Sequence, residues 1–262
     1  MARNDTYDAR PARRETAVGA GAQLLLLLLL GAVGLGPVGW VCGLAFATAG
    51  WAVLSRALRR ARLRRFGPAD RVTLVRATLV GGVTALVADS FASAPPVPVL
   101  VVLTAVALVL DGVDGRVARR TGTCSPLGAR FDMEVDAFLI LVLSVYVARD
   151  LGPWVLLIGG MRYAFVAAAR VLPWLRAPLP PSTARKTVAA LQGVLLLLAS
   201  STLLPHTADA WVVLAALAML VWSFGRDVGW LWRTRPSRVR AAAVVPHGEP
   251  RAEEVLRPVR AA

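Results

Sequence analysis

The sequence predicts an all-α fold, a polytopic membrane helix bundle with about eight spans. Hydrophobic residues make up 56% of the 262 residues, and the mean hydropathy is +0.60. A soluble domain is rarely this apolar. Apolar stretches of about twenty residues, long enough to cross a bilayer as a helix, recur along the chain. The net charge of +14 comes mainly from arginines between these stretches, which is typical of cytoplasmic loops facing an anionic leaflet.

The first two apolar stretches predict a transmembrane hairpin over residues 16–58, after a basic cytoplasmic tail at 1–15. Thr16–Leu35 and Val38–Leu58 are each about one membrane width long, and Gly36-Pro37 is a turn signal between them. Arginines flank both ends, so both ends are expected on the cytoplasmic side. One long tilted helix is an alternative. A cleaved signal peptide is disfavoured, because a second apolar stretch follows without a clear cleavage site.

Six further spans are predicted within residues 67–232, at roughly 71–91, 96–118, 130–149, 152–172, 184–204 and 209–232. Their connections alternate between arginine-rich and arginine-poor. This alternation predicts a multi-pass protein of the cell membrane with both termini in the cytoplasm. Residues 233–262 are rich in Pro, Arg and Ala, and we expect them to form a disordered basic tail. The positive charge follows membrane loops and not an aromatic-lined groove, so no nucleic-acid partner is expected.

Four aspartates lie at the ends of two predicted spans, where carboxylates are costly and usually functional. Asp111 and Asp114 are spaced i, i+3, and Gly115 and Ala118 continue the same helix face. On the next predicted helix, one face carries an i, i+4, i+8 series: Gly128, Asp132 and Asp136. If the two faces meet across a turn at Thr121-Gly122, four carboxylates converge on one cavity.

Such a cluster predicts a metal site formed by Asp111, Asp114, Asp132 and Asp136. Four carboxylates would repel one another strongly in a partly dry site, and two divalent cations would offset that charge. No cluster of His and Cys is present, so the ligands are oxygens and the expected ions are Mg²⁺ or Mn²⁺. A pair of such ions suits displacement at phosphorus. Helix caps or ion pairs with neighbouring arginines are the structural alternative.

These residues resemble the signature of the CDP-alcohol phosphatidyltransferases, D-x₂-D-G-x₂-A-R-x₈₋₉-G-x₃-D-x₃-D. Every fixed position is filled, by Asp111, Asp114, Gly115, Ala118, Arg119, Gly128, Asp132 and Asp136. The segment from Pro68 to Arg76 resembles the start of the family's first core helix. The resemblance covers residues 67–232 and implies a six-helix core, to which the hairpin at 16–58 is an addition.

The resemblance also implies a reaction, in which CDP-diacylglycerol gives its phosphatidyl group to an alcohol and releases CMP. Asp136 is implied as the general base, in addition to its role among the metal ligands. CDP would be bound by Asp114, Gly115, Ala118, Arg119 and Gly128. The family further implies a homodimer in the membrane, engaged in phospholipid synthesis.

A second basic cluster bears on the acceptor alcohol and comprises Arg162, Arg170, Arg185 and Lys186. Arg185-Lys186-Thr187 with Gln192 resembles phosphatidylglycerophosphate synthases. An acceptor-binding role would suit a phosphorylated alcohol such as glycerol 3-phosphate or inositol phosphate. Cytoplasmic loop charge explains Arg170, Arg185 and Lys186 equally well. Arg162 is different, because it interrupts an apolar stretch, which favours a role inside the bundle. Met161-Arg162-Tyr163 departs from the synthase pattern, because no acidic residue follows the arginine.

Two other functions are compatible with a carboxylate-bearing bundle. A membrane transporter could use the aspartates as a cation site, although such sites tend to lie near the midplane in broken helices. The aspartates here lie at the inner ends of predicted spans. An inactive scaffold is disfavoured because no residue of the signature is missing.

Overall fold

The computed structural model describes residues 10–61, 68–121 and 126–234, with side chains for 17–56, 70–113 and 128–234. These ranges contain eight α-helices and two short 3₁₀ helices, and no strand, so the predicted all-α class is confirmed. The helices are α1 (Arg10–Ala32), α2 (Pro37–Ala61), α3 (Pro68–Asp89), α4 (Val97–Thr121), α5 (Pro126–Leu151), α6 (Leu156–Val171), α7 (Thr183–Ser200) and α8 (His206–Thr234), with η1 (Pro153–Val155) before α6 and η2 (Pro173–Arg176) after it.

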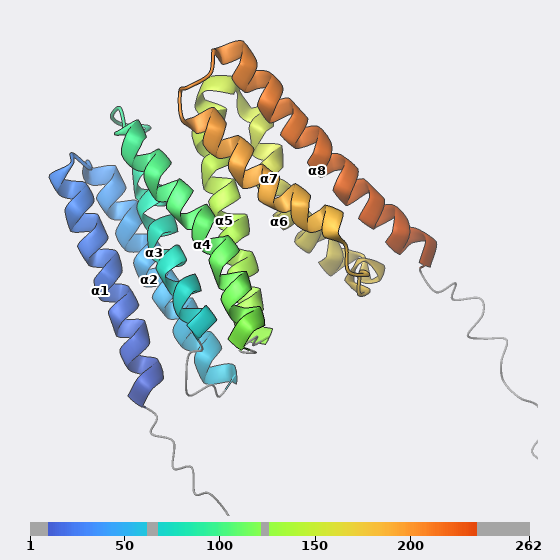
Figure 1. The fold of residues 1–262 in the computed structure, drawn as a ribbon, viewed down its shortest axis with the longest axis horizontal. Helices are drawn as coiled ribbons and strands as arrows, with labels where there is room; N and C mark the ends of the chain where they lie inside the picture. Colours follow the sequence, from blue (N-terminus) through green and yellow to red (C-terminus); the bar gives the residue numbers. More distant parts are fainter. Residues whose placement is uncertain (1–9, 62–67, 122–125, 235–262) are drawn as a thin grey trace, which may run out of the picture.

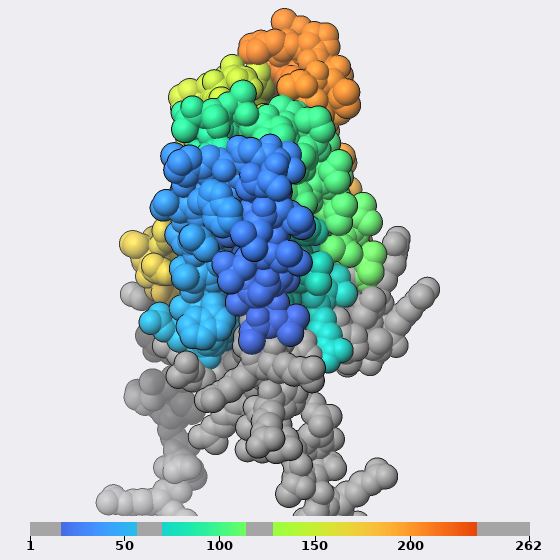
Figure 2. Space-filling view, turned by 90° about the vertical axis from the view of Figure 1, so that its left-hand side faces the viewer, coloured from blue at the N-terminus to red at the C-terminus, as the bar shows by residue number. Residues whose placement is uncertain are grey.

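The helices run alternately up and down (Figure 1), so that the start of α1 and the end of α8 lie on the same side of the bundle. Helix α3 is central, because it packs against α1, α2, α4 and α5. A single cluster of buried apolar side chains runs from α1 to α8 and includes Leu27, Val83, Leu100, Leu143 and Val213. Figure 2 shows that α1 and α2 cover one flank of the bundle.

Within the part of the chain that the structure describes, four helical segments are long and apolar enough to cross a membrane: Pro37–Arg56, Asp70–Asp89, Pro153–Val171 and His206–Thr234. Two shorter apolar segments, Ala17–Ala32 and Val97–Val113, belong to α1 and α4. Each of the eight predicted spans corresponds to one helix. The polytopic bundle is therefore confirmed, whereas a count of eight crossings and their orientation stay predictions.

The predicted N-terminal hairpin is present, and the alternative of one long tilted helix is wrong. The chain turns between α1 and α2, where Gly34 has a φ of +107°, a conformation that favours glycine. Pro37 is the first residue of α2, where its fixed φ and missing N–H suit a helix. Helix α1 begins at Arg10, ahead of the predicted Thr16. Residues 1–9 and the predicted disordered tail from 235 lie outside the described residues.

Asp89 attaches the hairpin to the core at the end of α3. Its buried carboxylate accepts hydrogen bonds from the backbone N–H groups of Gly36 (3.0 Å) and Gly39 (3.2 Å). Ser93 Oγ donates a third bond, at 2.8 Å. The first N–H groups of α2 have no partner within their own helix, so a carboxylate supplied by another helix acts as its N-cap.

Replacing Asp89 by Ala removes this cap and leaves buried N–H groups without an acceptor. We expect the free energy needed to open the hairpin to fall by about 1–2 kcal/mol. Hydrogen exchange of the Gly36 and Gly39 amides measures this directly and should accelerate. Asp150→Ala is the control, because the Asp150 side chain is exposed. Equal protection of both amides in Asp89→Ala and native protein would contradict the assignment.

Candidate active site

The candidate site begins with a buried stripe on α3. Thr73, Arg76, Val80, Val83 and Val87 follow a helical spacing, and all are buried. Arg76 is the largest fully buried side chain among the described residues, with a relative exposure of 0%. An arginine at this position in an apolar helix is costly unless carboxylates or carbonyls surround it.

Helices α4 and α5 each contribute a stripe that ends in carboxylates. On α4, Leu100, Thr104 and Ala107 are fully buried, and Asp111 continues their face one turn later. On α5, Asp132 and Asp136 are spaced i, i+4, and the buried Leu139 and Leu143 continue that face. The same apolar stripes that pack these helices against α3 therefore set the positions of the aspartates.

Arg76 joins the three helices through its guanidinium group. One nitrogen contacts both Asp111, at 3.0 Å, and Asp136, and the other contacts Asp132. Its Nε donates a hydrogen bond to the carbonyl oxygen of Ala107 at 3.2 Å. The planar guanidinium presents its donors in a fixed fork, so it orients the carboxylates as well as offsetting their charge.

The carboxylates face a more open region than the arginine does. The side chains of Asp111, Asp132 and Asp136 are 37%, 32% and 36% exposed, against 1% for Arg76. One oxygen from each aspartate lies within 4.8 Å of the others. Three carboxylates against one guanidinium leave a net negative charge. An all-oxygen, partly accessible, anionic cluster fits a hard divalent cation, so the donor set agrees with the predicted metal site.

The part of the sequence that forms this site matches a known protein family. A sequence profile described as CDP-alcohol phosphatidyltransferase matches residues 66–222, which is more than half of the chain. The chain belongs to the CDP-alcohol phosphatidyltransferase family. It is therefore a membrane-protein transferase of the kind that acts on CDP-linked substrates. The matched region starts before α3 and excludes α1 and α2.

Two curated relatives share a shorter segment. The chain is 44% identical over 68 residues to ethanolaminephosphotransferase 1 of Pongo abelii, covering 22% of this chain and 17% of that protein. It is 42% identical over 71 residues to ethanolaminephosphotransferase 1 of Homo sapiens, covering 22% and 18%. The chain thus spans less than a fifth of these relatives in the matched segments. No solved structure matches it significantly.

The structure brings together three of the four aspartates of the family signature, namely Asp111, Asp132 and Asp136. The backbone of α4 includes the other predicted residues Asp114, Gly115, Ala118 and Arg119, but their side chains lie outside the described residues. Gly128 lies in the first turn of α5 and is partly exposed. Metal binding by all four aspartates and CDP binding by the signature stay predictions.

Arg162, the first predicted acceptor residue, pairs with a carboxylate outside the aspartate cluster. Its guanidinium donates to Glu134 Oε1 at 2.6 Å. Glu134 lies two residues from both Asp132 and Asp136, so it projects from the opposite side of α5. The buried Nε of Arg162 has no hydrogen-bond partner among the described residues. The structure therefore directs this arginine away from the aspartates.

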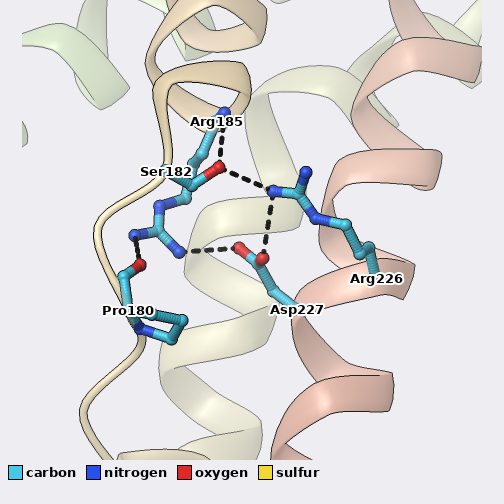
Figure 3. A network of polar contacts seen from close by, with 5 residues as sticks. All are labelled: Pro180, Ser182, Arg185, Arg226 and Asp227. Atoms are coloured by element: carbon cyan, nitrogen blue, oxygen red, sulfur yellow. Dashed lines mark hydrogen bonds and ion pairs between the residues drawn. The ribbon is translucent and has the colours of Figure 1, made fainter.

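Arg185 is held at the start of α7 by the network in Figure 3. It donates to Asp227 Oδ2 and to the carbonyl oxygen of Pro180, each at 3.0 Å, while Ser182 caps the helix. Arg226 of α8 also contacts Asp227 and Ser182. Arg170 and Lys186 are exposed. Through these contacts Arg185 links the start of α7 to α8. Acceptor binding by the basic cluster stays a prediction.

Sequence reasoning assigned no role to Arg76, although the residue was visible in the segment that resembles the first core helix. The available signal was an arginine well inside the apolar stretch 71–91, whose other charged residues, Arg71 and Asp89, lie near its two ends. Such a residue requires a carboxylate partner in the bundle. The nearby aspartates on the next two predicted spans were the obvious candidates.

Replacing Arg76 by Met leaves three carboxylates facing one another around an apolar side chain. Breaking a buried ion pair lowers the free energy of unfolding strongly, but these carboxylates are about one third exposed. We therefore expect the free energy of unfolding to fall by about 3 kcal/mol, the lower end of the usual range. Added Mg²⁺ should raise the unfolding temperature of this variant more than that of native protein, since a cation can replace the guanidinium charge. Thermal unfolding in detergent measures both effects.

Arg56→Met is the matched control, because Arg56 is exposed near the end of α2. It should unfold like the native protein and show no added response to Mg²⁺. An Arg76→Met protein as stable as this control would show that the guanidinium does not hold the cluster together.

Proposed function

We propose that this protein transfers the phosphatidyl group of CDP-diacylglycerol to the hydroxyl group of an alcohol and releases CMP. The observation that carries the proposal is the convergence of Asp111, Asp132 and Asp136 in a family whose members act on CDP-linked substrates. Its partners would be CDP-diacylglycerol, the acceptor alcohol and the surrounding lipids. A homodimer stays a prediction.

The proposed reaction is a single displacement at phosphorus. The acceptor oxygen attacks the phosphorus that carries diacylglycerol, and the bond from this phosphorus to the bridging oxygen of the diphosphate breaks. CMP leaves with the electron pair of that bond. Asp136 would take the proton of the acceptor hydroxyl, and its partial exposure leaves it accessible to an alcohol.

Asp111, Asp114, Asp132 and Asp136 would hold the cation, proposed as a pair of Mg²⁺ or Mn²⁺ ions. Bound there, a divalent ion polarises the phosphoryl group and stabilises the negative charge on the departing CMP. Arg76 contacts three of these carboxylates from the buried side of the site. It contacts Asp111, Asp132 and Asp136 together, so it fixes the carboxylates before any substrate arrives.

We propose that all eight helices cross the cell membrane, with the aspartates and both termini at the cytoplasmic face. The alternation of basic and arginine-poor connections supports this orientation. In this arrangement residues 67–232 are the catalytic core, and the hairpin at 16–58 is an added element. A site at the membrane boundary suits the reaction, because the lipid enters from the bilayer and CMP leaves to water.

Two kinds of acceptor for the transferred group have support. A phosphorylated alcohol is favoured by the general excess of arginine, although Arg162 and Arg185 are paired with Glu134 and Asp227. The second candidate reverses the roles of lipid and alcohol. The relatives are named ethanolaminephosphotransferase, which suggests a CDP-linked amino alcohol as donor and a lipid hydroxyl as acceptor.

Asp132→Asn and Asp136→Asn each test the site. Each change keeps the side chain's shape and removes one charge from the cluster. We expect CMP release to fall by at least about a hundredfold, because Asp132→Asn weakens cation binding and Asp136→Asn removes the base as well as a ligand. Exposed Asp150→Asn is the control and should retain native activity. Native rates in either site variant, with normal membrane insertion, would refute the assignment.

Removal of divalent cations should stop CMP release, since the aspartates are themselves negative and cannot stabilise the negative charge on the departing CMP. The assay uses purified protein in a chelator, followed by addition of Mg²⁺ or Mn²⁺. Activity should return with either ion. An enzyme that works equally well in chelator would contradict the proposed metal role.

Mass spectrometry of the lipid product separates the two acceptor candidates. One sample receives CDP-diacylglycerol with a panel of phosphorylated and free alcohols, and the other receives CDP-ethanolamine with diacylglycerol. Product in the first sample alone supports the proposed direction. Product in the second sample alone reverses it and leaves the site assignment intact.

A further inference from the structure

The short helix η2 lies against the ends of α6 and α8 at one corner of the bundle. Trp174 of η2 packs edge-on against Trp232 of α8, with ring centroids 5.6 Å apart. The next residue of η2, Leu175, is buried and holds the short helix against the bundle. This region, which we call the η2 corner, comprises two tryptophans and three arginines: Arg170, Trp174, Arg176, Trp232 and Arg233.

The η2 corner lies at the level where two apolar helical segments end. Pro153–Val171 and His206–Thr234 are each long and apolar enough to cross a membrane, and Arg170 and Arg233 are their next-to-last residues. Tryptophan is enriched at the boundary between membrane and water. Helix α5 starts near the aspartates and α6 runs back towards the same end of the bundle (Figure 1), so the corner and the aspartates lie at one membrane face.

Arg176 is held in place by the end of α6. Its Nε donates to the carbonyl oxygen of Ala169 at 2.7 Å, and one terminal nitrogen donates to the carbonyl oxygen of Arg170 at 3.3 Å. The Ala169 carbonyl lacks a partner within α6, because the residue four positions on is Pro173, which has no N–H. The exposed guanidinium is therefore oriented by backbone, and its remaining N–H donors are available to an acceptor.

The positive charge of the η2 corner is not offset by nearby carboxylates. Residues 156–234 contain two acidic residues, Asp209 and Asp227. Asp227 is already paired with an arginine of α7 and another of α8 (Figure 3), and Asp209 lies in the first turn of α8, at its opposite end. Arg170 and Arg233 are exposed, and no ion pair reaches either from the described part of the chain. The corner thus keeps the charge of its three arginines.

An exposed apolar surface adjoins these charges on α6. Val166, Val171 and Leu172 are 43%, 79% and 41% exposed. Val166 and Arg170 are spaced i, i+4, so they lie on one face of the helix. In a bilayer the apolar part of such a face contacts acyl chains, and the arginine reaches the headgroups. The corner presents apolar surface and then positive charge, which is the order of the chains and phosphate of a phospholipid.

We propose that the η2 corner binds the phosphate headgroup of an anionic bilayer phospholipid that the enzyme does not consume. The phosphate oxygens accept hydrogen bonds from Arg176 and Arg170, Arg233 adds positive charge from α8, and the acyl chains lie along the apolar face of α6. Basic pockets between membrane helices at the cytoplasmic face bind anionic headgroups in this way. A zwitterionic lipid gains less, because the described corner offers no carboxylate to its ammonium group. This inference does not depend on the proposed reaction.

The test measures the ratio of phosphatidylglycerol to phosphatidylcholine that the full-length protein retains from an equimolar mixture, using native mass spectrometry. Arg170→Gln combined with Arg233→Gln removes two charges and leaves the bonds of Arg176 to α6 intact, so the ratio should fall about tenfold. Arg56→Gln combined with Arg130→Gln is the matched control, because it removes two exposed arginines of α2 and α5 outside the corner. This control should keep the native ratio.

Arg170→Gln alone should lower the ratio about threefold, and it decides the matter if the double variant does not fold. Equal ratios in the two double variants overturn the proposal, as does a native protein that retains both lipids equally. Excess glycerol 3-phosphate should leave phosphatidylglycerol bound, because it lacks the chains that lie along α6. Displacement of the lipid by glycerol 3-phosphate would overturn the proposal and assign the corner to a free phosphorylated alcohol.

Discussion

The arrangement of this protein depends on the buried guanidinium of Arg76 and the three carboxylates around it. A charge at this depth is tolerated only with partners, and partners from both α4 and α5 are needed to satisfy its donors. The contact therefore fixes α3, α4 and α5 relative to one another. Replacing a buried ion pair by apolar residues is often neutral for stability. The position of these charges is accordingly better explained by the site than by the fold.

The central position of α3 connects the two sides of the molecule. One stripe of α3 holds Arg76 toward the aspartates, and α3 also packs against both helices of the hairpin. Asp89, at the far end of the same helix, caps α2. The hairpin lies outside the region matched by the family, yet it packs directly on the helix that organises the site.

The fold class and the eight helices could be predicted, because apolar length and arginine placement report directly on helices in a bilayer. The convergence of Asp111, Asp132 and Asp136 followed from helical spacing and one short connection. Arg76 was not assigned, since a spacing rule finds residues on one helix and not a partner two helices away. The Asp89 cap depends on contacts across fifty or more residues, which leave no local pattern in the sequence. The apolar run around Arg162 indicated a role inside the bundle but not its partner, Glu134, and Arg185 could not be separated from loop charge because its partner, Asp227, lies on a distant segment.

We propose that carboxylates of α4 and α5 together hold the divalent cations beside Arg76. Anomalous X-ray scattering from crystals grown with Mn²⁺ tests it most directly. We expect an anomalous peak within about 2–2.5 Å of oxygens from Asp111, Asp132 and Asp136. A fully occupied ion elsewhere, with these three side chains pointing apart, would contradict it.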